Sequence, residues 1–104
     1  MSKPFFVYML RCVDGSFYVG HTDDLDKRIE EHERGGKCLY TSQRRPLRLI
    51  WFDEFPTRDE AKAAEIQIKA WSRVKKVALA RSSVEALRHA ARKPRYRNRK
   101  AVVE

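Results

Sequence analysis

Apolar runs along the chain predict three strands. The runs Phe5–Cys12, Phe17–Gly20 and Pro46–Phe52 are rich in β-branched and aromatic residues, as strands are. Asp14-Gly15 lies between the first two runs and is typical of a tight hairpin turn. We therefore expect the chain to open with a β-hairpin and to form a third strand near its middle.

Helical spacing of apolar residues follows the hairpin. Leu25 and Ile29 are four residues apart, so they share one face of a helix. The polar cluster at residues 22–24 can cap the start of this helix. Gly35-Gly36 can end it. The pattern predicts a first helix between these two signals.

A second helical region follows the third strand. Thr57 and Glu60 have the spacing of a capping box. Four apolar positions then repeat at helical spacing: Ala61, Ala64, Ile68 and Trp71. Further helical stretches are expected over residues 75–80 and 84–91, divided at Ser82-Ser83. The predicted order, strand-strand-helix-strand-helix-helix, is that of an α+β fold.

The register of the hairpin decides whether Tyr8 and Tyr18 share a face. A two-residue turn would direct them to opposite faces, because side chains alternate along a strand. A three-residue loop over residues 13–15, with Gly15 in a left-handed bulge, instead pairs Leu10 with Tyr18. Tyr8 then lies on the same face. We predict the three-residue loop with its bulge, because a shared tyrosine site requires it.

Length and composition indicate one small domain. The chain has 104 residues, of which 42% are apolar, so a single folded core is expected over residues 1–91. No apolar run approaches the roughly 20 residues of a membrane span, and the start has no signal-peptide pattern. Cys12 and Cys38 lack zinc-like spacing. We therefore expect a protein of the reducing cytoplasm.

Basic residues outnumber acidic ones. The counts are 23 Lys and Arg against 14 Asp and Glu, a formal net charge of +9, which favours a polyanionic partner such as nucleic acid. Residues 92–104 hold six of the basic residues and a single acid, and we expect this tail to be disordered when free. It is either a solubilising end or a phosphate-binding arm that uses Arg95, Arg97 and Arg99.

Three charged or titratable side chains fall on inward helix edges. Arg28 and His32 lie within the same arc as Leu25 and Ile29, where a charge is unfavourable unless it is paired or faces a cleft. Taken alone, Arg28 could extend to solvent from the edge of the stripe, with His32 near the helix end. Glu65 lies beside the apolar stripe of the second helix, where a solvated residue or an ion-pair partner is the ordinary alternative to a metal ligand.

Taken in order, these residues resemble the GIY-YIG nuclease superfamily, specifically its small single-domain bacterial members. Phe6-Val7-Tyr8 is similar to the first motif, with Phe6 in place of the glycine, and Tyr18-Val19-Gly20 is similar to the second. Residues 20–28, 40–46 and 65–73 also resemble the family's continuation. The resemblance covers roughly residues 4–80. It implies a small three-stranded antiparallel sheet flanked by helices, which is the GIY-YIG fold.

The resemblance also implies roles for the tyrosines and histidines. Tyr8 and Tyr18 would line a catalytic site, one of them acting as general base toward water or orienting it. A phenol with an ordinary pKa near ~10 is a poor base at neutral pH, so a neighbouring cation must help it ionise. His21 and His32 are the expected sources of that help.

Phosphate and metal contacts complete the implied site. Arg28 would hold the scissile phosphate and stabilise its developing charge. Glu65 would bind one divalent ion, Mg²⁺ or Mn²⁺, which needs few protein ligands because it keeps its waters. Arg28, Arg44 and Arg45 would contact the nucleic-acid backbone.

Three functions follow from these residues. The first is a metal-dependent endonuclease that hydrolyses DNA phosphodiester bonds, on structured or damaged DNA in repair or recombination. The second is a nucleic-acid-binding module with little or no cleavage. The third is an adaptor whose basic surface binds an acidic protein. The expected partner is DNA, with RNA as the alternative, and neither a membrane nor a small-molecule cofactor is expected. The oligomeric state is left open.

Overall fold

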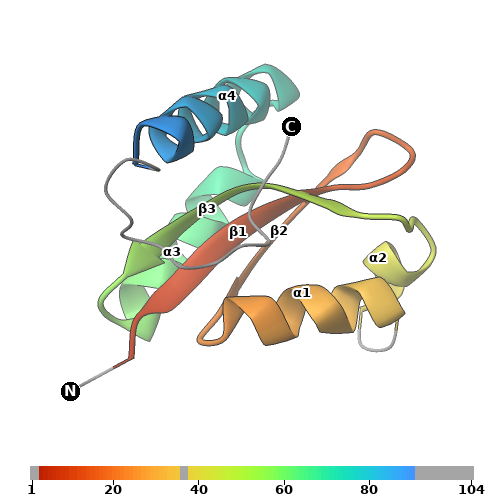
Figure 1. Ribbon diagram of the computed structural model, residues 1–104, viewed down its shortest axis with the longest axis horizontal. Helices are drawn as coiled ribbons and strands as arrows, with labels where there is room; N and C mark the ends of the chain where they lie inside the picture. The colour runs from red at the N-terminus through yellow and green to blue at the C-terminus, as the bar shows by residue number, and fades with distance from the viewer. Residues whose placement is uncertain (1–2, 36–37, 91–104) are drawn as a thin grey trace.

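The computed structural model describes residues 3–35 and 38–90 (Figure 1). In chain order the elements are β1 Phe5–Arg11, β2 Phe17–Thr22, α1 Leu25–Arg34, α2 Leu39–Ser42, β3 Arg48–Phe55, α3 Arg58–Lys69 and α4 Arg73–Ala90. The three strands form one antiparallel sheet in the order β2-β1-β3. The predicted α+β class and the antiparallel sheet flanked by helices are confirmed. The basic tail predicted over residues 92–104 lies outside the described residues.

The sheet has a helix layer on each face, as Figure 1 shows. Alternation along the central strand β1 places Tyr8 and Leu10 in a cluster with Leu25 of α1. Val7 and Met9 point to the other face, where residues of α3 and α4 cover them. All four of these strand residues are fully buried. The fold is therefore three layers, with β1 at the centre of both clusters.

The hairpin has the register that the tyrosines require. Leu10 pairs with Tyr18, and Tyr8 pairs with Gly20. The loop closes through a hydrogen bond from the Cys12 amide to the Ser16 carbonyl, 2.8 Å long, and Gly15 is left-handed with φ of 87°. The predicted three-residue loop is confirmed, so both tyrosines lie on the face that α1 covers.

Helix caps fix where the site-bearing helices begin. The Asp24 side chain accepts a hydrogen bond from the Lys27 amide at the start of α1, and Thr57 accepts one from the Glu60 amide at the start of α3. Gly35 ends α1 with φ of 77°. The predicted starts and the predicted end of these helices are confirmed.

Two local predictions were wrong, and one short helix was not predicted. The helix predicted to divide at Ser82-Ser83 is continuous in α4, because serine lowers helix stability by only about 0.5 kcal/mol and its neighbours favour a helix. The third strand begins at Arg48 and not at Pro46, since proline cannot donate a ladder hydrogen bond. The four-residue helix α2 was not predicted, because one turn is too short to show periodicity.

Candidate active site

The candidate residues gather around the edge strand β2. Tyr18 and Gly20 face α1, which carries Arg28 and His32. The next residue, His21, pairs with Val7 and therefore faces α3. The candidate residues therefore lie on both faces of the sheet at this edge, with the tyrosines on the α1 face and His21 on the α3 face.

Tyr8 lies at the centre of the first side. Its side chain is fully buried, and its hydroxyl is 2.9 Å from Nε2 of His32. Nε of Arg28 donates to the same hydroxyl over 3.4 Å. The Tyr18 ring centroid lies 6.5 Å from that of Tyr8. The two tyrosines, Arg28 and His32 therefore form one cluster, as expected.

Gly20 makes room for the Tyr8 hydroxyl. A Cβ atom at position 20 would lie 2.5 Å from Oη of Tyr8 and 2.7 Å from its Cζ. Such contacts are far below ordinary van der Waals separation, so only glycine fits without displacing the tyrosine. The glycine of the second tyrosine motif thus has a packing reason, which the motif alone did not reveal.

His32 is a neutral hydrogen-bonding group in this site. Burial and the nearby positive charge of Arg28 lower the pKa of His32 to about 4. Its Nδ1 lies 2.9 Å from Oγ1 of Thr41, and that hydroxyl donates to the Cys38 carbonyl over 3.4 Å. The Thr41 oxygen therefore accepts the proton of Nδ1, which leaves Nε2 to accept from Tyr8. The expectation that His32 supplies a positive charge is corrected.

Thr41 belongs to the site, although no role was predicted for it from the sequence. It is fully buried, and it fixes the tautomer of His32 through the hydrogen bond described above. A hydroxyl nine residues after a histidine gives no periodic signal, because the connection runs through a loop and the short helix α2.

The two tyrosines differ in their surroundings. Burial raises the pKa of Tyr8, while the hydrogen bond and positive charge of Arg28 act in the opposite direction. Burial also raises the pKa of Tyr18, strongly, and a hydrogen bond with Cys38 adds to this rise. Of the two phenols, Tyr8 is the one that contacts both a cation and a proton acceptor.

Arg28 lies between Tyr8 and solvent. Its Nη1 is 3.2 Å from a carboxylate oxygen of Glu31, and about one third of its side chain is exposed. The simple alternative of an arginine that only extends into water is therefore excluded. An anion could bind to the exposed part of this side chain.

Glu65 forms the second side of the site. One carboxylate oxygen contacts Nδ1 of His21, and the other lies 2.7 Å from Nζ of Lys69. Burial raises the pKa of Glu65, but the hydrogen bonds and charges of Lys69 and His21 outweigh it and hold the pKa below its usual value. The carboxylate is therefore ionised at neutral pH. Only 12% of the side chain is exposed.

His21 belongs to this carboxylate and not to a tyrosine hydroxyl. Besides its contact with Glu65, its Nε2 is 3.5 Å from Nη1 of Arg58. The prediction that His21 helps a tyrosine to ionise is therefore not supported by the geometry. The alternation of β2 explains this, because His21 points to the face opposite Tyr18.

Glu65 is the residue of the site that could hold a divalent ion. Among residues 3–35 and 38–90, no three His, Cys, Asp or Glu side chains gather into a metal-binding group. Glu65 offers a largely buried, ionised oxygen ligand, and Mg²⁺ takes most of its ligands from water and phosphate. Such an ion would have to replace the Lys69 ammonium at the carboxylate.

Arg44 and Arg45 have structural partners. Nε of Arg44 donates to Asp14 over 3.0 Å, and its guanidinium lies 3.8 Å from the centre of the Tyr40 ring. Arg45 donates to the carbonyl oxygens of Ser42 and Glu33. The structure therefore uses both guanidinium groups to hold the loops near α2. The predicted contacts of Arg95, Arg97 and Arg99 lie outside the described residues.

No helix in the described part of the chain is long and apolar enough to cross a membrane.

Known proteins are similar to this chain in sequence. Residues 4–78 match the GIY-YIG catalytic domain. A UPF0213 protein from Staphylococcus aureus (strain Mu50) is 42% identical over 74 residues, which cover 71% of this chain and 90% of that protein. A solution NMR structure of a protein from E. faecalis is 32% identical, with a TM-score of 0.52 and coverage of 94% of this chain and 97% of that chain. Another, of a UPF0213 protein from Bacillus halodurans, is 38% identical, covers 88% of each chain and has a TM-score of 0.46. This small protein belongs to the GIY-YIG family, alongside the UPF0213 proteins.

Proposed function

We propose that the protein is a metal-dependent endonuclease that hydrolyses phosphodiester bonds in DNA. The observation that carries this proposal is the position of the Tyr8 hydroxyl between the guanidinium of Arg28 and the unprotonated Nε2 of His32. A hydroxyl placed between a cation and a proton acceptor is suited to proton transfer. The family's catalytic domain and the net charge of +9 support a nucleic-acid substrate.

Tyr8 is the proposed general base, and His32 is the acceptor of its proton. Tyr8 is fully buried in the free protein, so substrate binding has to open a path to its oxygen. As a water molecule then attacks phosphorus, its proton passes to the Tyr8 oxygen, and the phenolic proton passes to Nε2 of His32. This relay removes the need for free phenolate, which would be scarce because burial raises the pKa of Tyr8. Substrate phosphate beside Arg28 offsets the positive field that lowers the pKa of His32, so His32 becomes a better acceptor when substrate is bound.

Arg28 is the proposed phosphate ligand. Its guanidinium is partly exposed beside Tyr8, so it can hold a non-bridging phosphate oxygen while it still donates to the phenol. As negative charge grows on that oxygen during attack, the hydrogen bond strengthens. This differential stabilisation is what lowers the barrier.

Glu65 is the proposed ligand of one Mg²⁺ or Mn²⁺ ion. When bound, the ion polarises the phosphate and stabilises the leaving oxygen. His21 orients the carboxylate from the protein side. Lys69 would have to release the carboxylate for a metal to be held there, and its ammonium would then be free to contact substrate phosphate.

Structured or damaged DNA, as met in repair or recombination, is the proposed substrate class. Contacts to the backbone carry little sequence information, and the candidate residues offer mainly phosphate contacts. Recognition by the shape of the nucleic acid is therefore favoured over recognition of a base sequence.

A second candidate is a nucleic-acid-binding module that cuts slowly. The observation that favours it is the occupation of both Glu65 oxygens by His21 and Lys69, which competes with metal binding. Under this alternative, Arg28 would still contact phosphate, but added metal would not produce cleavage.

A cleavage assay separates the two candidates. Single-stranded, duplex and branched DNA are incubated with the full chain and Mg²⁺, and the wild type is compared with Glu65→Ala and Arg28→Ala. Matched controls are Glu60→Ala, on the same helix as Glu65, and Arg34→Ala, on the same helix as Arg28. Loss of cleavage in the first pair alone supports the endonuclease. Activity that survives in the first pair rules out the assigned site, and tight binding without cutting by the wild type supports the binding module.

A further inference from the structure

Arg11 and Arg48 lie directly opposite each other on β1 and β3. Both are exposed. Like charges in this cross-strand position destabilise a sheet. Neither has a carboxylate partner within ion-pair distance among the residues that the structure describes. Among the side chains that the structure describes, the two cations therefore lie side by side without a neutralising carboxylate, and an anion between them would relieve their repulsion.

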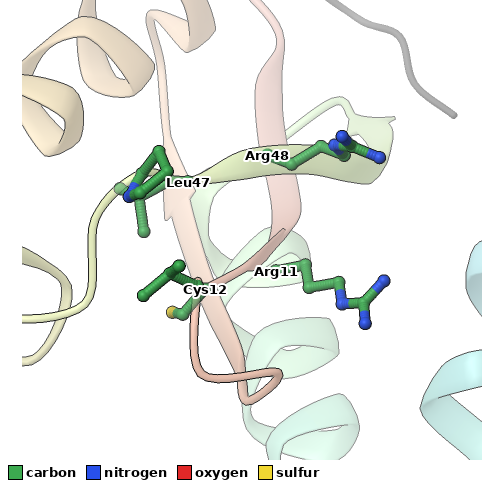
Figure 2. Close-up of a pocket in the computed structure, with 6 residues that line it drawn as sticks. Arg11, Cys12, Leu47 and Arg48 are labelled. Carbon is green, nitrogen blue, oxygen red and sulfur yellow. The ribbon is translucent and has the colours of Figure 1, made fainter.

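The two arginines border a cavity at the ends of their strands. The cavity has a volume of about 290 Å³ and is lined by Arg11, Cys12, Val13, Pro46, Leu47 and Arg48. Figure 2 shows the two arginine side chains leaving the strands toward one side, with Cys12 and Leu47 on the other. The volume is just below the ~300–1,000 Å³ of drug-sized ligand pockets. A cavity of this size holds a small group, and Arg11 and Arg48 give its border a positive charge.

A third arginine extends this basic surface across the sheet. Nη1 of Arg73 donates to the Gly15 carbonyl over 2.8 Å, and its guanidinium lies 4.5 Å from the centre of the Phe17 ring. Phe17 pairs with Arg11 across β1 and β2. Arg73, Arg11 and Arg48 thus form a row over the three strands at the hairpin end.

This row lies on the same face of the sheet as α3. Arg11 follows Val7 and Met9 at alternating positions of β1, and those two residues pack with Ala61 of α3. Glu65 belongs to the same helix. Residues of α3 and α4 cover the middle of this face, so a nucleic-acid backbone near Glu65 would have to pass around these helices to reach the three arginines at the hairpin end.

We propose that Arg11 and Arg48 form a second phosphate-binding site, which holds the nucleic-acid backbone away from the bond that is cut. This proposal rests on the proposed function, because its ligand is the nucleic acid that the protein is proposed to cut. Two guanidinium groups can donate several hydrogen bonds to one phosphate. Such contacts position a strand without reading its sequence. Residues of the cleavage site are not part of this second site.

The test compares two charge-matched double variants of the full chain. One is Arg11→Gln with Arg48→Gln. The control is Arg34→Gln with Arg81→Gln, which removes two exposed arginines from α1 and α4. Affinity for a DNA duplex is measured with EDTA over a range of salt concentrations.

The Arg11 and Arg48 variant is expected to bind about tenfold more weakly at low salt. The slope of log affinity against log salt should also fall by about 1, as for one lost phosphate contact. The control should keep the wild-type slope. Equal effects in both variants, or no effect in either, would overturn the proposal.

Thermal unfolding checks that the variant is folded. The Arg11 and Arg48 variant should melt at or above the wild-type temperature, because the repulsion between the two cations is gone. A variant that melts lower contradicts the unneutralised pair on which the proposal rests. DNA binding is also measured with single Arg48→Gln, and single Arg81→Gln is its control.

Cleavage, measured separately with Mg²⁺, distinguishes this proposal from the proposed function. Wild-type protein that binds DNA through Arg11 and Arg48 but does not cut contradicts the endonuclease and supports the second site. If the wild type cuts DNA and the Arg11 and Arg48 double variant binds DNA as tightly as the wild type, the second site alone is overturned. Absence of DNA binding by the wild type overturns both.

A titration with inorganic phosphate tests whether the site takes a free anion instead. If phosphate shifts the NMR signals of Arg11 and Arg48 and DNA does not, the site binds a free anion and the assignment to the nucleic-acid backbone is wrong.

Discussion

The Tyr8 hydroxyl lies 2.9 Å from Nε2 of His32, and the rest of the candidate site is organised around this hydrogen bond. Thr41 fixes the tautomer of His32 from behind, Arg28 approaches the same hydroxyl, and Gly20 leaves space for it. The pair links the central strand β1 to α1 through buried polar groups. Buried polar groups of this kind are sensitive to pH and to small changes in volume, so they can be tested without substrate.

Acid should destabilise the protein through His32. Its pKa is lowered to about 4 in the folded state, against an ordinary value near ~6.5. Protonation therefore favours the unfolded chain: the stabilisation is complete above pH ~6.5 and is lost as the pH falls toward ~4, by about 3 kcal/mol in all. Denaturant unfolding of wild type and His32→Gln at several pH values measures this. The variant should lose less stability over that range, and two parallel curves would contradict the prediction.

Gly20→Ala should lower the free energy of unfolding. The new Cβ would lie 2.5 Å from Oη of Tyr8, and displacing a fully buried side chain costs about 1–3 kcal/mol. Chemical denaturation of the variant gives the loss directly. In a Tyr8→Phe background the same substitution should cost somewhat less, because Oη is gone while Cζ, 2.7 Å from the new Cβ, still obstructs it. An equal loss in both backgrounds would mean that the tyrosine hydroxyl is not the obstacle.

Lys69→Gln should strengthen metal binding at Glu65. The Lys69 ammonium lies 2.7 Å from one carboxylate oxygen and competes with any cation for it. Titration with Mn²⁺, followed by calorimetry or by electron paramagnetic resonance, should show a few-fold tighter binding in the variant. Lys62→Gln, on the same helix, is the control and should bind Mn²⁺ as the wild type does. Weaker binding in Lys69→Gln would show that the lysine is not a competitor.

Arg44→Gln should affect stability and leave DNA binding largely unchanged. The substitution removes the bond to Asp14 and the contact with the Tyr40 ring, which together contribute about 1 kcal/mol. Arg34 pairs with Glu30 on an exposed surface, so Arg34→Gln should change stability by less. Denaturant unfolding and salt-dependent DNA binding provide the two readouts. If the slope of log DNA affinity against log salt falls in Arg44→Gln, Arg44 contacts the nucleic-acid backbone as first predicted.

Local sequence signals determined much of this fold in advance. The caps at Asp24 and Thr57 place the starts of α1 and α3 because their side chains bond nearby backbone amides. Gly15 required a left-handed turn, and that requirement fixed the register which brings Tyr8 and Tyr18 together. These features depend on neighbours within a few residues, so they can be read from the chain.

The parts that could not be predicted depend on contacts distant in sequence. His21 follows Gly20 along β2, yet it contacts Glu65, 44 residues away. Whether His32 carries a charge depends on its burial and on Arg28, not on its position in a helix. Arg44 was expected to contact nucleic acid because it is basic, but Asp14 lies beside it only after the hairpin and α2 have packed.

The central claim is that Tyr8, linked to His32, removes the proton of the attacking water. Single-turnover cleavage of branched and duplex DNA with saturating Mg²⁺ tests it most directly, in wild type, Tyr8→Phe and the control Tyr40→Phe. The account predicts that Tyr8→Phe slows cleavage by about 10²–10⁴-fold with DNA affinity unchanged, and that Tyr40→Phe cuts at nearly the wild-type rate. Cleavage by Tyr8→Phe at the wild-type rate would contradict the account.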